Sequence, residues 1–166
     1  MDHLWSPWRM KYIRRQKTPK GCVFCEAVQK EDGEDNLIVA RGEHAFVILN
    51  RYPYTSGHIM IVPFDHMGTF KEMDDEACAE VMRLIRQGID ILDRVYKPDG
   101  YNMGTNLGAS AGAGIENHIH FHLVPRWGGD TNYMTSISGT RVLPEDLKET
   151  FKRLKDAWPK DNKSKK

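Results

Sequence analysis

The segment ENHIHFHLVPRW, residues 116–127, decides the fold of this chain because it places a histidine at every second position. The histidines alternate with large apolar side chains in the order His118, Ile119, His120, Phe121, His122 and Leu123. Successive side chains of a β-strand point to opposite faces, so the pattern predicts a strand with three imidazoles on one face and an apolar row on the other. A lone histidine is commonly structural, whereas three in alternation indicate a metal site, a nucleophile with helper groups, or both.

The sequence around this strand predicts an antiparallel sheet. Segments rich in branched and aromatic residues are separated by short turns, as expected when neighbouring strands pair with each other. The predicted strands lie within residues 36–50, where Arg41–Glu43 joins two of them, and within residues 58–64, 100–108 and 118–125.

A long amphipathic helix is predicted between Asp74 and Tyr96, because apolar residues recur there at helical spacing and acidic residues stand at its start. Shorter helices are predicted within residues 25–31 and 144–158. The apolar row of the histidine strand is expected to pack on the long helix. We therefore expect an α+β fold, with an antiparallel sheet and a long helix packed on one face, formed by a single domain over residues 1–158.

The composition excludes several classes of protein. Lysine and arginine number 24 against 23 aspartates and glutamates, so the formal net charge of +1 gives no reason to expect a nucleic acid or an anionic membrane as partner. No apolar run approaches the roughly 18 residues of a membrane span, and the N-terminus lacks the pattern of a secretory signal. Residues 159–166 are polar and basic, and we expect a disordered tail. The Cys-x-x-Cys pair and the odd cysteine count favour a reducing, cytoplasmic location.

A neutral imidazole suits attack on a phosphorus ester. Its ordinary pKa is about 6.5, so the ring is available at neutral pH, and the phosphoramidate that forms divides one difficult displacement into two easier ones. The second ring nitrogen must then donate to a fixed acceptor, often a backbone carbonyl. The preceding loop carries Gly108, Gly112 and Gly114, whose backbone N–H groups could approach an anionic oxygen. Turn chemistry alone also explains such a loop, but its position beside the histidines favours a phosphate cradle.

These motifs resemble those of the histidine-triad (HIT) family of nucleotide hydrolases and transferases. HIHFHLV, residues 118–124, meets the family pattern His-φ-His-φ-His-φ-φ, in which φ is apolar. NRYPYTSGHIMIVP, residues 50–63, resembles the family's ribose-binding segment, and NLG, residues 106–108, resembles its phosphate-contacting segment. LWSPWRMKYI, residues 4–13, and PRWGGDTNYM, residues 125–134, are similar to the branch of bacterial diadenosine tetraphosphate phosphorylases and fragile-histidine-triad-like hydrolases.

The resemblance extends over most of the chain and implies a role for each matching residue. His120 corresponds to the nucleophile that becomes adenylylated, and His122 to the histidine that contacts the phosphate oxygens and helps the leaving group. Asn50 corresponds to the ribose-binding residue, with His58 of the same motif after it, and Asn106 corresponds to a phosphate contact. An apolar slot for the base, for which ordinary core packing is the alternative, is implied at Val23, Phe24 and Ile48.

One departure from the family concerns the loop before the histidines. Many members have Gly-Gln-Ser or Gly-Gln-Thr there, and the hydroxyl can help the leaving group. This chain has Gly-Ala-Gly-Ile at residues 112–115, with Ser110 as a substitute hydroxyl earlier in the loop. The assistance to the leaving group and the choice of acceptor therefore stay open.

Cys22 and Cys25 form a Cys-x-x-Cys pair, which is typical of either a metal site or a redox centre. In zinc-bearing relatives the ligands resemble this pair together with His66 and His118. The resemblance thus implies a closed tetrahedral Cys2His2 set that holds a structural zinc ion and braces one end of the histidine strand. No catalytic metal is required, although Mg²⁺ can accompany a polyphosphate substrate.

The resemblance implies an enzyme that cleaves a small nucleotide substrate. This would be a dinucleoside polyphosphate such as diadenosine tetraphosphate, split through an adenylyl-histidine intermediate on His120, with water or phosphate as the acceptor. The alternatives are a nucleoside phosphoramidate hydrolase, and a zinc-stabilised nucleotide-binding or sensing module with little turnover.

A homodimer is also expected. The long helix carries apolar residues beyond one narrow stripe, among them Leu84, Ile91 and Tyr96, and such a helix is commonly buried on a second side. The resemblance implies that two sheets join into one across a two-fold axis. The alternative is that the N-terminal arm or the C-terminal helix covers this surface within one chain.

Overall fold

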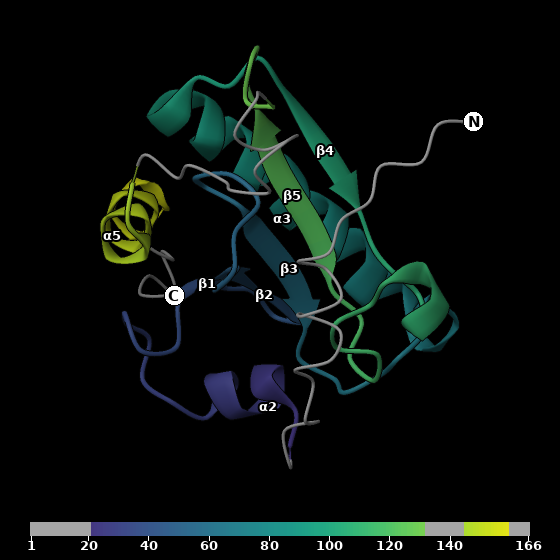
Figure 1. Ribbon diagram of the computed structural model, residues 1–166. Coiled ribbons are helices and arrows are strands. Elements are labelled where there is room, and N and C mark those ends of the chain that lie inside the picture. Colours follow the sequence, from purple (N-terminus) through teal and green to yellow (C-terminus); the bar gives the residue numbers. More distant parts are fainter. Residues whose placement is uncertain (1–20, 132–144, 160–166) are drawn as a thin grey trace, which may run out of the picture.

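The computed structural model describes residues 21–131 and 145–159, and its centre is a five-stranded sheet (Figure 1). The strand order is β1-β2-β3-β5-β4, and every neighbouring pair is antiparallel. The expected α+β class is therefore confirmed. The N-terminal arm and almost all of the basic tail lie outside the described residues. The strands are β1 (Ile38–Arg41), β2 (Ala45–Leu49), β3 (Ile59–Pro63), β4 (Gly100–Gly104) and β5 (Phe121–Arg126).

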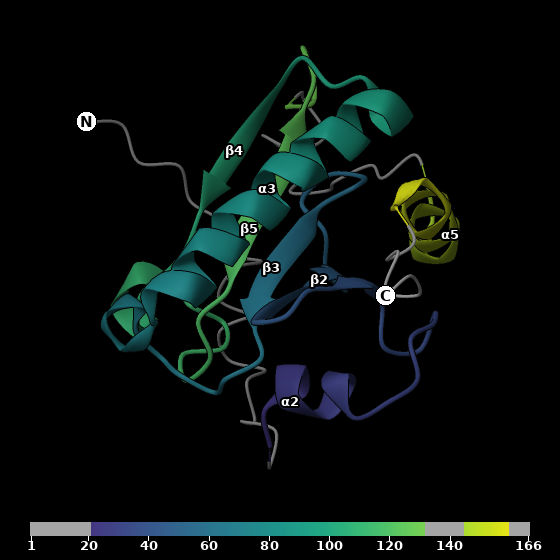
Figure 2. The same cartoon turned by 180° about the vertical axis from the view of Figure 1, so that it is seen from behind.

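Helix α3 (Asp75–Tyr96) lies across one face of the sheet, as predicted (Figure 2). Its first turn is capped by the Asp74 side chain, which accepts a hydrogen bond from the backbone N–H of Ala77. The other helices are α2 (Val23–Val28) and α5 (Leu147–Ala157), and two short 3₁₀ turns are η1 (Phe70–Glu72) and η2 (Ala109–Ala111).

A glycine lets α3 approach the sheet closely. A Cβ atom at Gly88 would lie 2.9 Å from Cδ1 of Ile59 and 3.2 Å from Cδ2 of Leu123, so a larger residue would push the helix away from β3 and β5. Leu123 belongs to the apolar row between the histidines. The expectation that this row packs under the long helix is therefore confirmed for Leu123, whereas the ring of Phe121 packs edge-on against that of Phe70 in η1.

The predicted histidine strand is shorter than expected. Strand β5 begins at Phe121, so His118 and His120 precede it. The neighbouring strand β3 ends at Pro63, which has no backbone N–H to continue the ladder. The backbone before β5 forms hydrogen bonds outside the strand ladder instead. The N–H of Ile119, for example, donates to the carbonyl oxygen of Met67. The triad therefore runs from a loop segment into a strand.

The wide apolar face of α3, on which the expected homodimer partly rested, is buried within the chain. Leu84 and Ile91 are 7% and 0% exposed and belong to the core formed with the sheet and α5. The hydroxyl group of Tyr96 donates to Glu145, just before α5. This surface needs no second protomer to cover it, so that argument for a dimer does not hold.

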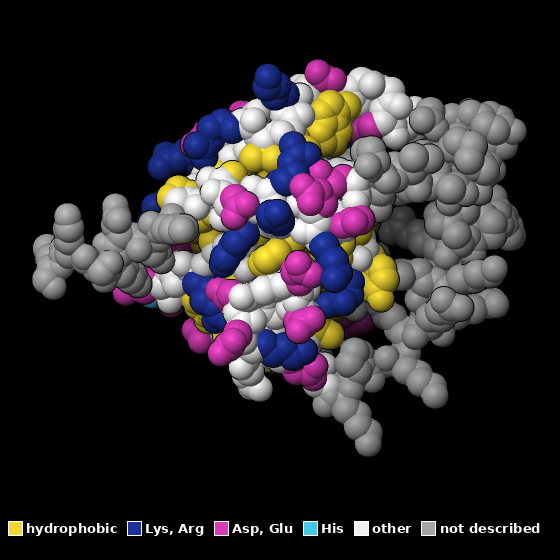
Figure 3. Space-filling model, turned by 90° about the vertical axis from the view of Figure 1, so that its left-hand side faces the viewer, with side chains coloured by type: hydrophobic (Ala, Val, Ile, Leu, Met, Phe, Trp, Pro, Cys, Tyr) yellow, Lys and Arg dark blue, Asp and Glu magenta, His cyan; other side chains and the backbone are white. Residues whose placement is uncertain are grey.

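The surface on the side of α5 carries mixed charge. Figure 3 shows this side of the molecule, where basic and acidic side chains are interspersed among small apolar patches. Lys148, for example, forms an ion pair with Glu34 at 3.1 Å. Such a surface has no field of a single sign that would attract a polyanion to this side. Within residues 21–131 and 145–159, no helix is long and apolar enough to span a bilayer.

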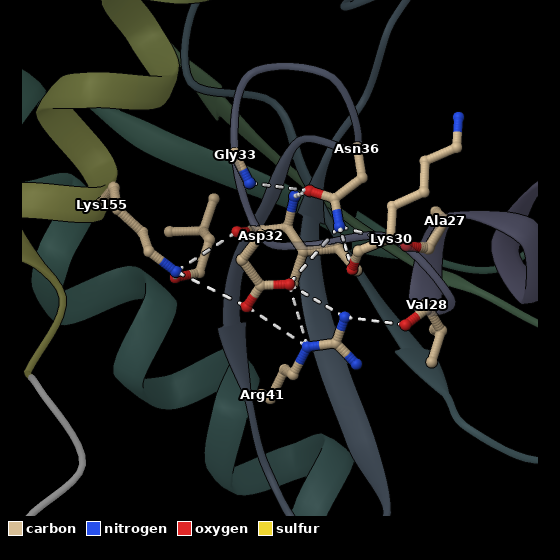
Figure 4. A network of polar contacts seen from close by, with 10 residues as sticks. Ala27, Val28, Lys30, Asp32, Gly33, Asn36, Arg41 and Lys155 are labelled. Carbon is tan, nitrogen blue, oxygen red and sulfur yellow. Dashed lines mark hydrogen bonds and ion pairs between the residues drawn. The ribbon is translucent and has the colours of Figure 1, made fainter.

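The buried side chain of Asn36 connects α2 to the start of β1 (Figure 4). Its Oδ1 accepts hydrogen bonds from the backbone N–H groups of Gly33 (3.0 Å) and Ile38 (3.2 Å). Its Nδ2 donates to the carbonyl oxygen of Ala27 (3.1 Å). One side chain thus satisfies polar backbone groups that the loop between the two elements would otherwise leave unpaired.

The same network reaches α5 through an ion cluster. The Asp32 carboxylate accepts a hydrogen bond from Nε of Arg41 (3.0 Å) and lies 3.8 Å from Nζ of Lys155. Lys155 also donates to the carbonyl oxygen of Val39 (2.9 Å), on β1, which is an edge strand. A lysine from α5 therefore satisfies part of an edge that could otherwise pair with another chain.

We expect Asn36→Ala to lower the free energy of unfolding by about 2 kcal/mol or more, because it leaves several buried backbone groups without partners. Urea denaturation measures the change. The matched control is Asp35→Ala, at the exposed neighbouring position, which should change stability by less than about 0.5 kcal/mol. Equal stabilities for the two variants would contradict this role of Asn36.

Candidate active site and metal centre

His120 is held with one ring nitrogen bonded and the other unprotonated. Its Nδ1 lies 2.9 Å from the carbonyl oxygen of His118, which can only accept, so Nδ1 carries the proton. The Nε2 atom of the neutral ring then keeps its lone pair. Burial lowers the pKa of His120, since the charged ring would lose its hydration, and only 5% of the residue is exposed. A neutral imidazole with an unprotonated nitrogen can act as a nucleophile at neutral pH.

His122 is the one triad histidine that lies inside β5, and it contacts a histidine from outside the triad. Its Nδ1 lies 2.9 Å from Nε2 of His58, a fully buried residue just before β3. Burial, together with the neighbouring His120, lowers the pKa of His122 to about 4. His122 is therefore neutral at physiological pH.

The turn between β2 and β3 surrounds His58. The backbone N–H of Tyr54 donates to Nδ1 of His58 (3.1 Å), and Nδ2 of Asn50 lies 3.3 Å from the same nitrogen. The ring of Tyr54 lies 4.7 Å from that of His58 and 6.0 Å from that of His122, between centroids. The structure thus brings the expected residues Asn50 and His58 to the triad. Sequence reasoning missed Tyr54, because one aromatic residue in a turn has no periodicity that would signal a contact.

The structure also brings together the four expected metal ligands. The ligand atoms of Cys22, Cys25, His66 and His118 all lie within 4.8 Å of one another. Nδ1 of His118 is 3.2 Å from Sγ of Cys22, and Nδ1 of His66 is 3.4 Å from Sγ of Cys25. The Nε2 atom of His118 donates to the carbonyl oxygen of Pro63 (2.9 Å), which leaves its Nδ1 lone pair directed at the thiols. Two thiols and two imidazoles at this spacing fit a tetrahedral zinc ion.

Helix α2 connects this cluster to the candidate nucleophile. Phe24 lies between Cys22 and Cys25 in the chain and is buried. The centroid of its ring is 5.3 Å from that of His118 and 5.1 Å from that of His120. The two cysteines therefore hold a helix whose aromatic side chain packs directly on the triad.

The two other residues of the expected base slot differ in exposure. Val23, on α2, is 39% exposed. Ile48 is buried in the core cluster, but it shares a row with Met60 and His122 across the sheet. Side chains in one cross-strand row point to the same face, so Ile48 lies on the histidine face. This placement agrees with a slot as well as with core packing.

The loop that contains Gly108, Gly112 and Gly114 follows Thr105, which connects it to the triad. The Thr105 hydroxyl donates a hydrogen bond to the carbonyl oxygen of His120 (2.7 Å). Asn106 follows, and its Nδ2 lies 3.5 Å from the carbonyl oxygen of Gly112. Gly112 has a φ of 90°, a conformation that favours glycine. Ser110 is exposed on η2, and no described contact brings it to a triad histidine. Gly114, the third expected residue of the cradle, is half-buried.

Comparison with known proteins agrees with this geometry. The HIT domain profile matches residues 31–129. A protein named AP-4-A phosphorylase from Mycobacterium tuberculosis is 38% identical over 95% of this chain and 85% of its own length. The chain therefore belongs to the HIT family.

Two further relatives bear on the chemistry of the site. The adenosine 5'-monophosphoramidase hnt1 of Schizosaccharomyces pombe is 25% identical over 76% of this chain and 90% of its own length. A crystal structure of a zinc-bound histidine triad family protein from Mycobacterium smegmatis superposes with a TM-score of 0.66 at 27% identity. That match covers 82% of this chain and 92% of the other. HIT-fold structures therefore include one that holds zinc.

We expect Cys22→Ser to lower zinc content and thermal stability together, because a structural zinc ion contributes directly to folding. Elemental analysis should find about one zinc per chain in the unaltered protein. The variant should hold much less and melt about 5 °C lower or more.

The third cysteine provides the control. Cys78 lies on α3, outside the cluster, so Cys78→Ser should retain its zinc. Folded protein without zinc, or equal zinc in both variants, would show that the four residues are not a zinc site.

Proposed function

We propose that this chain is a nucleotidyl-transferring enzyme that cleaves a dinucleoside polyphosphate, such as diadenosine tetraphosphate, through a covalent intermediate on His120. The observation that carries the proposal is the hydrogen bond from His120 Nδ1 to the carbonyl oxygen of His118, which leaves Nε2 unprotonated. An unprotonated and oriented imidazole nitrogen is what attack on the α-phosphorus requires. The name of the relative from M. tuberculosis supports a polyphosphate as the substrate.

The neighbouring residues are proposed to bind the nucleotide. His122 lies next to His120, with their ring centroids 4.9 Å apart, and donates to the phosphate oxygens that gain charge during the reaction. Asn50 binds the ribose hydroxyls, and His58 orients His122. Asn106 contacts the phosphate chain, together with the backbone of the loop that contains Gly112 and Gly114.

The base is proposed to lie against α2 and the histidine face of the sheet. Val23 offers an exposed apolar side chain there, while Phe24 and Ile48 form the buried floor. An apolar slot of this kind binds a nucleobase by burying its faces, with little discrimination by hydrogen bonds.

Zinc is proposed as a structural ion held by Cys22, Cys25, His66 and His118. When bound, it would supply rigidity at the start of the triad. His118 would then be fixed through both ring nitrogens, and its carbonyl oxygen would orient His120. Mg²⁺ enters the proposal only as a companion of the polyphosphate.

A homodimer in the cytoplasm is proposed as the working state. Strand β4 is an edge of the sheet, and Met103 on it is 55% exposed. A second copy could pair with this edge and extend the sheet. A reducing compartment suits the proposed zinc site, because Cys22 and Cys25 must stay reduced to bind the ion.

We expect His120→Asn to lower turnover of diadenosine tetraphosphate at least about 1000-fold, because the covalent route loses its nucleophile. Melting temperature and nucleotide affinity should stay close to those of the unaltered protein, since Asn can still donate to the His118 carbonyl. The control is His44→Asn, at the turn between β1 and β2, which should keep its activity. If the His120 variant retained more than about a tenth of the activity, the proposed mechanism would be wrong.

A further inference from the structure

The two sulfur atoms of the Cys-x-x-Cys pair lie close to each other as well as to the two histidines. Sγ of Cys22 and Sγ of Cys25 belong to a cluster whose ligand atoms all lie within 4.8 Å of one another. Cys22 is the N-cap residue of α2 and has an extended backbone, with φ −87° and ψ 118°, so it lies just outside the helix that contains Cys25. Both cysteines are half-buried, and His66 beside them is exposed, so a small solute can reach the sulfurs. Cys-x-x-Cys pairs in such places can form reversible disulfides.

The proposed zinc site connects the start of α2 to distant parts of the chain. Cys25 lies 41 positions from His66 in the sequence, and Cys22 lies 96 positions from His118. An ion held by all four residues therefore closes long loops, and a cross-link restricts the chain most when the loop that it closes is long. Such an ion would hold the first turn of α2 against the segment that leads into β5.

A disulfide between Cys22 and Cys25 restricts the chain much less. It closes a loop of four residues and makes no connection to His66 or His118. The sulfurs of a disulfide also lack the negative charge that binds zinc, and two histidines alone are too few ligands for a structural site. Oxidation would therefore exchange a long-range cross-link for a local one.

The C-terminal end of α2 is anchored independently of the cysteines. The carbonyl oxygen of Ala27 accepts a hydrogen bond from Nδ2 of Asn36 (3.1 Å), and that of Val28 accepts one from Nη2 of Arg41 (3.0 Å) (Figure 4). The side chain of Ala27 is also buried in the core cluster. These contacts involve neither a thiol nor a histidine, so loss of the zinc site leaves them in place.

The N-terminal end of α2 depends on the cysteines and carries part of the nucleotide site. The ring of Phe24 lies 5.3 Å from that of His118 and 5.1 Å from that of His120, between centroids. Val23, of the proposed base slot, is its neighbour in the chain. Without an ion to hold the two cysteines against His118, this end can turn outward about the fixed C-terminal end. Phe24 would then leave the triad, and the base slot would lose part of its floor.

We propose that Cys22 and Cys25 form an oxidation switch, in which a peroxide converts them to a disulfide, the zinc ion is released and the nucleotide site opens at α2. This inference rests on the proposed zinc site and on the proposed nucleotide site, and it adds a control to them. The reduced, zinc-bound form binds the nucleotide. The oxidised form binds it weakly, because the N-terminal end of α2 no longer packs on the triad.

The oxidation balances between the two thiolates and hydrogen peroxide. One sulfur attacks a peroxide oxygen, so that an S–O bond forms and the O–O bond breaks, which gives a sulfenic acid and a hydroxide ion. The second sulfur attacks the sulfenic sulfur, so that the S–S bond forms and the S–O bond breaks with release of a second hydroxide ion. The sulfurs lose two electrons in all and the peroxide oxygens gain them. Two protons from the solvent convert the hydroxide ions to water.

The first test treats the zinc-loaded, full-length protein with hydrogen peroxide. Peptide mass spectrometry should find a disulfide between Cys22 and Cys25, and a chromogenic chelator should detect about one zinc ion released per disulfide. Dithiothreitol with added zinc should reverse both changes. The control is Cys78→Ser, which lacks the cysteine outside the cluster and should respond in the same way.

NMR locates the movement of α2. Nuclear Overhauser contacts between the rings of Phe24 and His120 should be present in the reduced protein and absent after oxidation. Contacts between the side-chain amide of Asn36 and Ala27 should persist in both forms, because that anchor does not involve the cysteines. Retention of the Phe24 contacts would contradict the opening, and loss of both sets would contradict a movement confined to one end of the helix.

Calorimetry with AMP measures the consequence for binding. The reduced, zinc-loaded form should bind AMP at least about tenfold more tightly than the oxidised form, a usual size for the coupling between two sites. Equal affinities would overturn the inference, as would a disulfide that leaves zinc bound, or peroxide treatment that forms no disulfide. If the reduced form held zinc but bound no AMP, the proposed function would be wrong. Zinc release with loss of the Phe24 contacts would then still support the oxidation switch.

Discussion

The hydrogen bond from Nδ1 of His120 to the carbonyl oxygen of His118 is the constraint on which the site depends. It determines which nitrogen of His120 can react. His118 is itself fixed, because its Nε2 donates to the carbonyl oxygen of Pro63 and its Nδ1 faces the thiol cluster. Pro63 ends the central strand β3, so this strand, the four candidate zinc ligands and the proposed nucleophile form one continuous unit. A substitution at any of these points should therefore alter the orientation of the His120 ring.

Much of this arrangement could be predicted from the sequence, because it depends on local patterns. The alternation of His118 to Leu123 placed imidazoles and apolar side chains on opposite sides, and Leu123 does face α3. Helical spacing located α3, since an amphipathic helix must bury one face. The metal cluster followed from its donor types together with the family resemblance, and its four ligands do converge.

The remainder depends on contacts between distant residues, which no local pattern encodes. The start of β5 was misplaced because the partner strand ends at Pro63, and pairing cannot be read from one strand alone. Leu84 and Ile91 looked like an interface, but α5 and the sheet cover them within the chain. The contact of Tyr54 with His58 and His122 arises only when the turn folds back over the sheet.

The central claim is that a nucleotide becomes covalently attached to Nε2 of His120 during turnover. Rapid quenching of the protein with diadenosine tetraphosphate in phosphate-free buffer, followed by peptide mass spectrometry, tests it most directly. The account predicts an acid-labile adenylyl group on the peptide that contains His120, and its discharge when inorganic phosphate is added. Turnover without any adenylylated peptide, or with the adenylyl group on another residue, would contradict it.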